Sequence, residues 1–224
     1  MCSTADKPAL HTVVVYCGSS LGNNEAFVKA AQADKPALHT VVVYCGSSLG
    51  NNEAFVKAAQ ELGKSLLKRN ISLIYGGGSW GIMGVIAKTV HEGGGNVQGI
   101  VPKFFLERDP ESTLIGDTIT VEDMHARKKM FCEKADAFIA LPGGIGTLEE
   151  IVEMICWARL KLHTKPVGIL NTLNYYGGIL EWYQNALKVG FLNPCDANLF
   201  EVSDNCEQLI DALESRLTVL ANST

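Results

Sequence analysis

A glycine-rich segment followed by two acidic residues combines the marks of an anion site with groups able to do acid–base chemistry. The segment reads Leu-Pro-Gly-Gly-Ile-Gly-Thr-Leu-Glu-Glu over residues 141–150. An apolar run at 137–140, typical of a buried strand, precedes it, and a helical pattern follows it. Glycines at a strand-to-helix turn let the backbone approach a ligand, and the N–H groups at the helix start favour a phosphate. Because a phosphate cradle does not need Glu149 and Glu150, the segment predicts chemistry on a phosphorylated substrate.

The local pattern leaves two interpretations of Glu150 open. Thr147 and Glu150 have the spacing of a capping box, in which the glutamate only satisfies a backbone N–H at the helix start. The same glutamate could instead serve as a catalytic acid or base. Glu149 has a weaker functional case, because an acid in the first turn of a helix also stabilises the helix dipole.

The segment 122–134 places cations where a helix should be apolar. At helical spacing, Arg127 and Lys128 share a stripe with Phe131 that should face the core. An unpaired cation is expensive to bury, so we expect both side chains to point into a cleft and to meet a carboxylate or an anionic ligand. The alternative is that these long side chains only reach solvent at the rim of the apolar face.

Composition limits the classes of function. The chain has 224 residues, 47% of them hydrophobic, and a formal net charge of −5 with scattered lysines and arginines. We therefore expect a well-buried domain with no bulk affinity for nucleic acid or a membrane surface. No apolar run is long enough to span a bilayer, and the first residues lack a signal-peptide core. The seven cysteines form no Cys-x-x-Cys pair, which predicts reduced thiols, no metal site and a cytoplasmic location.

The start of the chain contains an identical duplication: residues 5–32 recur without a change at 33–60. Genuine repeat architectures need three or more units, so two identical copies favour a recent duplication or an artefact of the sequence. We therefore divide the chain into a duplicated segment, 1–32, and one domain, 33–224. Only the second copy runs on into residues 61–68, which complete its helix, and it is the copy that we expect in the native position. The first copy would be a frayed extension or an extra edge strand.

Strand-like and helix-like segments alternate along the domain, which predicts a single α/β domain with a doubly wound, Rossmann-like parallel sheet. The expected strands are 40–44, 71–75, 96–101, 136–141, 166–170 and, more weakly, 199–202. The expected helices are 51–69, 81–92, 122–134, 147–160, 175–189 and 205–220, and the segment 103–116 is expected to be a loop. Ligands in such folds bind beyond the carboxyl ends of the strands, where the glycine-rich turns fall.

The turn at 76–81, Gly-Gly-Gly-Ser-Trp-Gly, has the form of a dinucleotide fingerprint between a strand and a helix. That fingerprint also requires an acid at the end of the next strand, but here the strand ends in Val-Pro-Lys at 101–103. NAD binding is therefore disfavoured, and Gly77 and Gly78 are better explained by a ligand that needs room near the backbone. In the Cys-Gly-Ser-Ser turn at 45–48, Ser47 could bind a ribose or phosphate group, or could cap the following helix.

Taken together, three segments closely resemble the LONELY GUY (LOG) family of cytokinin riboside 5′-monophosphate phosphoribohydrolases. They are Gly-Gly-Gly-Ser-Trp-Gly-Ile-Met-Gly at 76–84, Met-His-Ala-Arg-Lys at 124–128 and Pro-Gly-Gly-Ile-Gly-Thr-Leu-Glu-Glu at 142–150. The resemblance implies hydrolysis of the N-glycosidic bond of an N6-substituted AMP, giving the free base and ribose 5-phosphate. It implies catalytic roles for Arg127 and Glu150, and a homodimer with sites near the subunit interface.

The resemblance also implies where the substrate binds. The phosphate is expected to bind the glycine-rich turn, at Gly143, Gly144, Gly146 and Thr147. Gly46, Ser47, Gly77, Gly78, Lys128 and Glu149 complete our predicted set of substrate-binding residues. No metal and no cofactor are expected, and no lysine context suits pyridoxal phosphate. The alternatives are a broader nucleosidase acting on AMP or GMP, and a non-catalytic nucleotide-binding protein.

Overall fold

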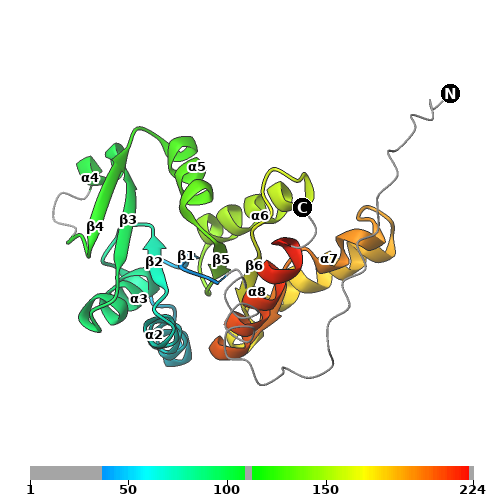
Figure 1. Ribbon diagram of the computed structural model, residues 1–224, viewed down its shortest axis with the longest axis horizontal. Helices are drawn as coiled ribbons and strands as arrows, with labels where there is room; N and C mark the ends of the chain where they lie inside the picture. Colours follow the sequence, from blue (N-terminus) through cyan, green and yellow to red (C-terminus); the bar gives the residue numbers. More distant parts are fainter. Residues whose placement is uncertain (1–36, 109–112, 222–224) are drawn as a thin grey trace, which may run out of the picture. The chain divides into compact units, whose positions relative to one another are not determined.

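The computed structural model describes residues 37–108 and 113–221 (Figure 1). The first copy of the duplicated sequence, and with it the predicted segment 1–32, lies outside these residues. The second copy supplies the first described strand, β1 (Thr40–Tyr44), as its continuity with the following helix predicted. No helix in the two described ranges is long and apolar enough to cross a membrane.

In the described residues, seven parallel strands form one sheet in the order β4-β3-β2-β1-β5-β6-β7. After β1, the strands are β2 (Ser72–Tyr75), β3 (Val97–Pro102), β4 (Asp117–Val121), β5 (Ala137–Ala140), β6 (Val167–Leu170) and β7 (Glu201–Ser203). The order reverses direction at β1, which pairs with β2 on one side and with β5 on the other. This confirms the predicted doubly wound α/β fold and places a topological switch point between β1 and β5.

Helices connect the strands and cover both faces of the sheet (Figure 1). They are α2 (Glu53–Lys68), α3 (Gly81–Glu92), α4 (Lys103–Arg108), α5 (Met124–Lys134), α6 (Ile145–Arg159), α7 (Gly177–Lys188) and α8 (Cys206–Ala221). Two short 3₁₀ helices lie at Thr172–Asn174 and Pro194–Asn198.

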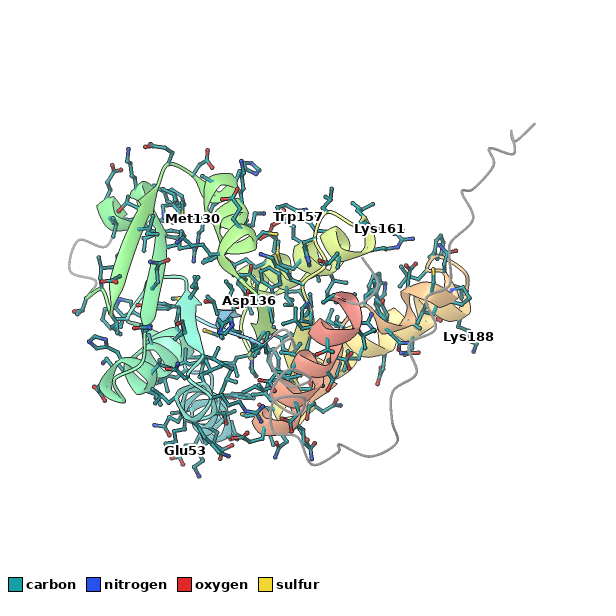
Figure 2. The ribbon with its side chains drawn as sticks, in the orientation of Figure 1. Glu53, Met130, Asp136, Trp157, Lys161 and Lys188 are labelled. Carbon is teal, nitrogen blue, oxygen red and sulfur yellow. The ribbon has the colours of Figure 1, made fainter. Side chains whose placement is uncertain are left out.

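Successive side chains of β1 point to opposite faces of the sheet, so the core has two layers. Val41 and Val43 are buried against α2, α3 and α8, whereas Val42 and Tyr44 are buried on the face that α5 and α6 cover. A partly exposed polar anchor fixes the start of this strand beside β5: the Asp136 carboxylate (labelled in Figure 2) accepts hydrogen bonds from the N–H groups of His39 and Thr40, at 2.9 and 2.8 Å. The amino ends of β1 and β5 are thereby joined, and parallel pairing up to Tyr44 and Ala140 places their carboxyl ends side by side.

The structure departs from the sequence-based expectation in one region. The segment 103–116, expected to be a loop, contains the short helix α4, and the strand β4 follows it without having been predicted. β4 lies at the edge of the sheet and only its last residue, Val121, is buried. A half-exposed edge strand lacks the continuous apolar run that marks the buried strands, which explains why the sequence did not reveal it.

Candidate active site

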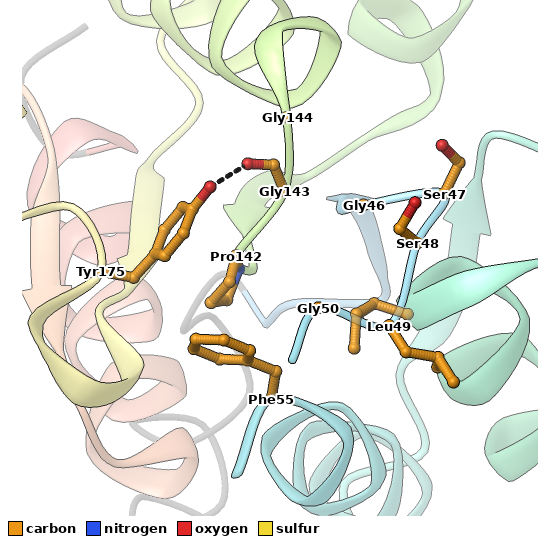
Figure 3. Close-up of a pocket in the computed structure, with 11 residues that line it drawn as sticks. Gly46, Ser47, Ser48, Leu49, Gly50, Phe55, Pro142, Gly143, Gly144 and Tyr175 are labelled. Carbon is orange, nitrogen blue, oxygen red and sulfur yellow. Dashed lines mark hydrogen bonds between the residues drawn. The ribbon is translucent and has the colours of Figure 1, made fainter. Parts of the chain in front are cut away.

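The turns that follow β1 and β5 form a cavity at the switch point of the sheet (Figure 3). Its volume is about 260 Å³. The residues that line it are Gly46, Ser47, Ser48, Leu49, Gly50, Phe55, Ile82, Pro142, Gly143, Gly144 and Tyr175. It lies where ligands bind in open α/β folds, and it contains four of the residues predicted to bind substrate.

The two turns pack directly against each other, which explains two of their glycines. The N–H of Gly46 donates a hydrogen bond to the carbonyl of Pro142 at 3.1 Å. A Cβ on Gly46 would lie 3.2 Å from the Cα of Gly143, and a Cβ on Gly143 would lie 2.2 Å from Oγ1 of Thr147. Gly46 and Gly143 therefore allow the two backbones to approach, whereas a Cβ on Gly144 or Gly146 would meet open space.

The N-terminus of α6 faces this cavity without a side-chain cap. Gly144 is the N-cap residue and has no side chain with which to accept from the helix. Of the two interpretations of Glu150, the capping box is wrong, because Thr147 is the third residue inside the helix and Glu150 the sixth. Glu150 is therefore free of a capping role, and the first N–H groups of α6 can meet an anion.

A second cavity, also of about 260 Å³, shares Ser47 with the first. Its lining comprises Ser47, Gly76, Gly77, Gly78, Trp80, Met83, Val101, Phe105, Leu106, Leu114 and Arg127. Gly77 has a φ of +84°, and a Cβ there would lie 2.1 Å from Cγ2 of Val101. The glycine turn thus lets the backbone form one wall of a mostly apolar cavity that contains a single charged side chain.

The second glycine-rich turn does not leave a free helix N-terminus for a dinucleotide. The N–H groups of Ile82 and Met83, in the first turn of α3, donate to the carbonyls of Ser48 and Gly46 at 3.4 and 3.2 Å. Gly81 permits this approach, because a Cβ there would lie 2.3 Å from the carbonyl carbon of Ser47. Since protein carbonyls occupy these donors, the turn is not built for a pyrophosphate.

Arg127 is the charged group of the second cavity. Its helix, α5, begins after Asp123, whose carboxylate accepts a hydrogen bond from the N–H of Ala126 at 2.8 Å. The guanidinium, only 9% exposed, donates to the carbonyl of Gly76 at 3.3 Å and lies 5.2 Å from the ring centroid of Phe131. Burial lowers the pKa of Arg127, and the nearby carboxylate of Glu150 opposes this shift.

Glu150 pairs with this guanidinium. An oxygen of its carboxylate lies 4.0 Å from a terminal nitrogen of Arg127, and the glutamate side chain is 12% exposed. Burial raises the pKa of Glu150 to about 6, while Arg127 acts in the opposite direction. The structure thus brings together the two residues predicted to be catalytic, and it gives the carboxyl a pKa suited to proton transfer near neutrality.

Lys128 and Glu149 form a separate ion-pair cluster between α5 and α6. The ammonium of Lys128 lies 2.5 Å from an oxygen of Glu149 and 3.1 Å from an oxygen of Glu153. Both carboxylates raise the pKa of this lysine against the effect of its burial. Lys128 and Glu149, like Glu150, line neither of the two cavities, but their ion pairs tie α5 to α6, which gives Lys128 and Glu149 a structural role.

Sequence reasoning missed the aromatic walls of the site. In Figure 3 the hydroxyl of Tyr175 donates to the carbonyl of Gly143, and its ring meets that of Phe55 edge to face at a centroid distance of 5.7 Å. Trp80 and Phe105 line the second cavity, and they are 60% and 40% exposed. The sequence signal was the place of Trp80 within the glycine-rich turn at 76–81; the other aromatic residues carried none.

The fold and site define an α/β protein with an uncapped helix N-terminus beside a buried arginine–glutamate pair. In the two described ranges, no group of three or more His, Cys, Asp or Glu residues could hold a metal ion.

Solved structures share the fold. The molybdenum cofactor carrier protein from Chlamydomonas reinhardtii matches 80% of this chain and 98% of its own at a TM-score of 0.58 and 23% identity. The molybdenum cofactor binding protein from Rippkaea orientalis matches 79% and 96% at a TM-score of 0.59 and 20% identity.

Sequence comparisons define the family. The family described as "Possible lysine decarboxylase" matches residues 83–213. The "Probable cytokinin riboside 5'-monophosphate phosphoribohydrolase LOG4" of Oryza sativa subsp. japonica is 42% identical, covering 94% of this chain and 80% of its own. The Arabidopsis thaliana protein named cytokinin riboside 5'-monophosphate phosphoribohydrolase LOG2 is 44% identical, covering 93% and 84%. The chain therefore belongs to the LOG family, as the three sequence motifs predicted.

Proposed function

We propose that this protein hydrolyses the N-glycosidic bond of an N6-substituted AMP and releases the free base and ribose 5-phosphate. The observation that carries the proposal is the buried pair of Arg127 and Glu150, 4.0 Å apart, beside an uncapped helix N-terminus. A protein that only binds nucleotides has no need of a buried carboxyl with a pKa of about 6 next to its anion site. The activity in the names of the LOG relatives is the same hydrolysis.

The phosphate end of the substrate anchors the reaction. In the proposal, the 5′-phosphate binds the free N–H groups at the start of α6, with Gly144 and Gly146 leaving room for it. This remote contact supplies binding energy that fixes the ribose near the catalytic pair. The corresponding nucleoside, which lacks the phosphate, should be a far worse substrate.

Glu150 acts at the anomeric carbon. Cleavage of the bond between C1′ and the base develops positive charge on the ribose, and the ionised carboxylate stabilises this charge and orients a water molecule. The water oxygen bonds to C1′, the electron pair of the broken bond leaves with the base, and overall the water contributes its hydroxyl to C1′ and its proton to the base. Arg127 has too high a pKa for routine proton transfer, so its role is to hold the carboxylate and the substrate in position.

The apolar cavity suits the base and its substituent. Trp80, Phe105, Leu106 and Leu114 line it, and Arg127 lies at its charged side. A purine ring and a hydrocarbon N6 substituent would both bury apolar surface there. This composition favours an isopentenyl-type substituent over unmodified AMP.

Lysine decarboxylation, the activity that the family description suggests, does not fit this site. A lysine that forms a Schiff base must be able to lose its proton, which burial or a neighbouring cation promotes. Lys128 instead contacts the carboxylates of Glu149 and Glu153, which raise its pKa and keep it charged.

We also propose a homodimer formed through the outer face of α6 and α7, in the cytoplasm. Ile145, at the start of α6, is 84% exposed, and Val152 and Trp182 add further exposed apolar surface. Because α6 also begins at the phosphate turn, an interface here would lie beside the site, in line with the resemblance. Sedimentation should give a dimer that Ile145→Glu converts to a monomer; a monomeric unmodified protein would contradict this part of the proposal.

The proposal is tested by measuring base release from three compounds: N6-isopentenyl-AMP, AMP and N6-isopentenyladenosine. Fast release from the modified monophosphate alone is the expected result. Equal rates with AMP would instead identify a broad nucleotide nucleosidase. A folded protein that binds ribose 5-phosphate and releases no base from any of the three would be a nucleotide-binding protein without the proposed activity.

A further inference from the structure

Tyr44, the last residue of β1, lies beneath the catalytic pair. It points to the face of the sheet that α5 and α6 cover, and it is 3% exposed. Its ring is held on two sides, because it meets Phe131 edge to face at 5.6 Å and stacks parallel to Phe138 at 6.1 Å. Phe131 is also the ring on which the guanidinium of Arg127 rests. The position of the tyrosine is therefore fixed by the same aromatic residue that supports the catalytic arginine.

The hydroxyl of Tyr44 is fully buried and makes no hydrogen bond to any residue that the structure describes. A buried polar group without a partner costs stability, so a phenylalanine would suit a purely apolar position better. The charged neighbours that act on this hydroxyl are Glu150, Glu153 and Arg127, with the thiol of Cys132 close by. Burial and the two carboxylates raise the pKa of Tyr44 well above its usual range, so the group remains a neutral O–H donor.

We propose that Tyr44 is a positioning residue for Glu150, and that its hydroxyl donates a hydrogen bond to the Glu150 carboxylate through one water molecule. The inference rests on the proposed function of Glu150. A donor to the ionised carboxylate lowers its pKa and fixes its direction. Tyr44 would thus keep Glu150 ionised in the range where burial alone would protonate it.

Other groups also act on Glu150, and the test must separate them from Tyr44. The charged groups that face it are Arg127 and Lys128 on α5, and Glu149 and Glu153 on α6. Glu153 is the competing acceptor, because its Oε2 atom is also buried without a hydrogen-bond partner in the described chain. If Tyr44 donates to Glu153 instead, removing the hydroxyl leaves the pKa of Glu150 unchanged.

The test is a titration of Glu150 by carbon NMR in protein labelled at the glutamate carboxyl carbons. The resonance is assigned by its loss in Glu150→Gln. Tyr44→Phe should raise the pKa of Glu150 by about one unit, because the ionised form loses a donor. The matched control is Tyr75→Phe, which removes a buried hydroxyl on the adjacent strand that donates to the carbonyl of Ile115. It should leave this pKa unchanged.

Kinetics give the second measurement. In Tyr44→Phe we expect kcat to fall about tenfold and the acidic limb of its pH profile to move up with the pKa, with KM little changed. An unchanged pKa of Glu150 in folded Tyr44→Phe would overturn the inference. Because the titration needs no turnover, a shifted pKa in a protein without hydrolase activity would contradict the proposed function and leave the role of Tyr44 standing.

Discussion

The guanidinium of Arg127 lies 4.0 Å from the carboxylate of Glu150, and both side chains are almost completely removed from solvent. Two opposing effects follow from this arrangement. Burial disfavours the charge of the glutamate and raises its pKa to about 6, while the arginine limits the rise. Glu150 is therefore mainly ionised at neutral pH but can be protonated in mild acid, which makes its ionisation observable.

We expect kcat to fall as the pH drops through about 6, because only ionised Glu150 stabilises the developing positive charge. The measurement is the pH profile of kcat for N6-isopentenyl-AMP between pH 4.5 and 8.5. The substrate phosphate also titrates near pH 6, at about the same value. Binding of ribose 5-phosphate over the same range is therefore the control, and a kcat that is flat down to pH 5 would contradict the assignment.

Glu150→Gln should lower kcat by about a thousandfold while increasing stability at high pH. The pKa of Glu150 is higher in the folded than in the unfolded state, so ionisation opposes folding once the pH rises through about 6. The shift from 4.5 to about 6 corresponds to about 2 kcal/mol. Urea unfolding at pH 8 should show this gain, and at pH 4 it should be absent. Equal losses of stability and activity would mean that the residue is structural.

Gly144→Ala should weaken phosphate binding without unfolding the protein. A Cβ on Gly144 meets no protein atom within 4 Å, so the added methyl group enters only the space where the phosphate is expected. We predict about tenfold weaker binding of ribose 5-phosphate by calorimetry, with an unchanged melting temperature.

Gly143→Ala is the matched comparison. Its Cβ would lie 2.2 Å from Oγ1 of Thr147 and 2.8 Å from the backbone nitrogen of Gly46, so the packing of the two turns must change. We expect a loss of about 2 kcal/mol in stability. Normal ribose 5-phosphate affinity in Gly144→Ala would show that the phosphate binds elsewhere.

Lys128→Met tests whether the lysine binds substrate, as the sequence predicted, or ties α5 to α6. The Lys128 side chain is 10% exposed and contacts Glu149 and Glu153. The substitution should therefore lower the free energy of unfolding by about 2 kcal/mol. Lys129→Met, on the same helix but 74% exposed, should change stability by less than about 0.5 kcal/mol. A large rise in KM for Lys128→Met at unchanged stability would instead support substrate binding.

The sequence predicted the fold because its buried strands are continuous apolar runs between clear helical patterns. The strands with such runs, β1, β2, β3, β5 and β6, were expected, and β7 was expected more weakly from 199–202. β4 escaped prediction because it is a half-exposed edge strand, and α4 because six residues are too few to show a helical period.

Some residues of the candidate site could be predicted from the sequence and others could not, for a physical reason. Arg127 stood out because a cation in an apolar stripe requires a partner, and the structure supplies Glu150 from another helix. Tyr44 and Tyr175 could not be found in this way, because an aromatic residue beside an apolar segment fits any core. Only the packing of β1, α5 and α6 shows that the hydroxyl of Tyr44 is buried beside charged groups.

The most direct test of the central claim is a quantitative measurement of both products from N6-isopentenyl-AMP, with the unmodified protein and Glu150→Gln run together. The account predicts equal amounts of free base and ribose 5-phosphate from the unmodified protein, and almost none from the folded variant. Base release by Glu150→Gln at the unmodified rate, or no release by folded unmodified protein, would contradict it.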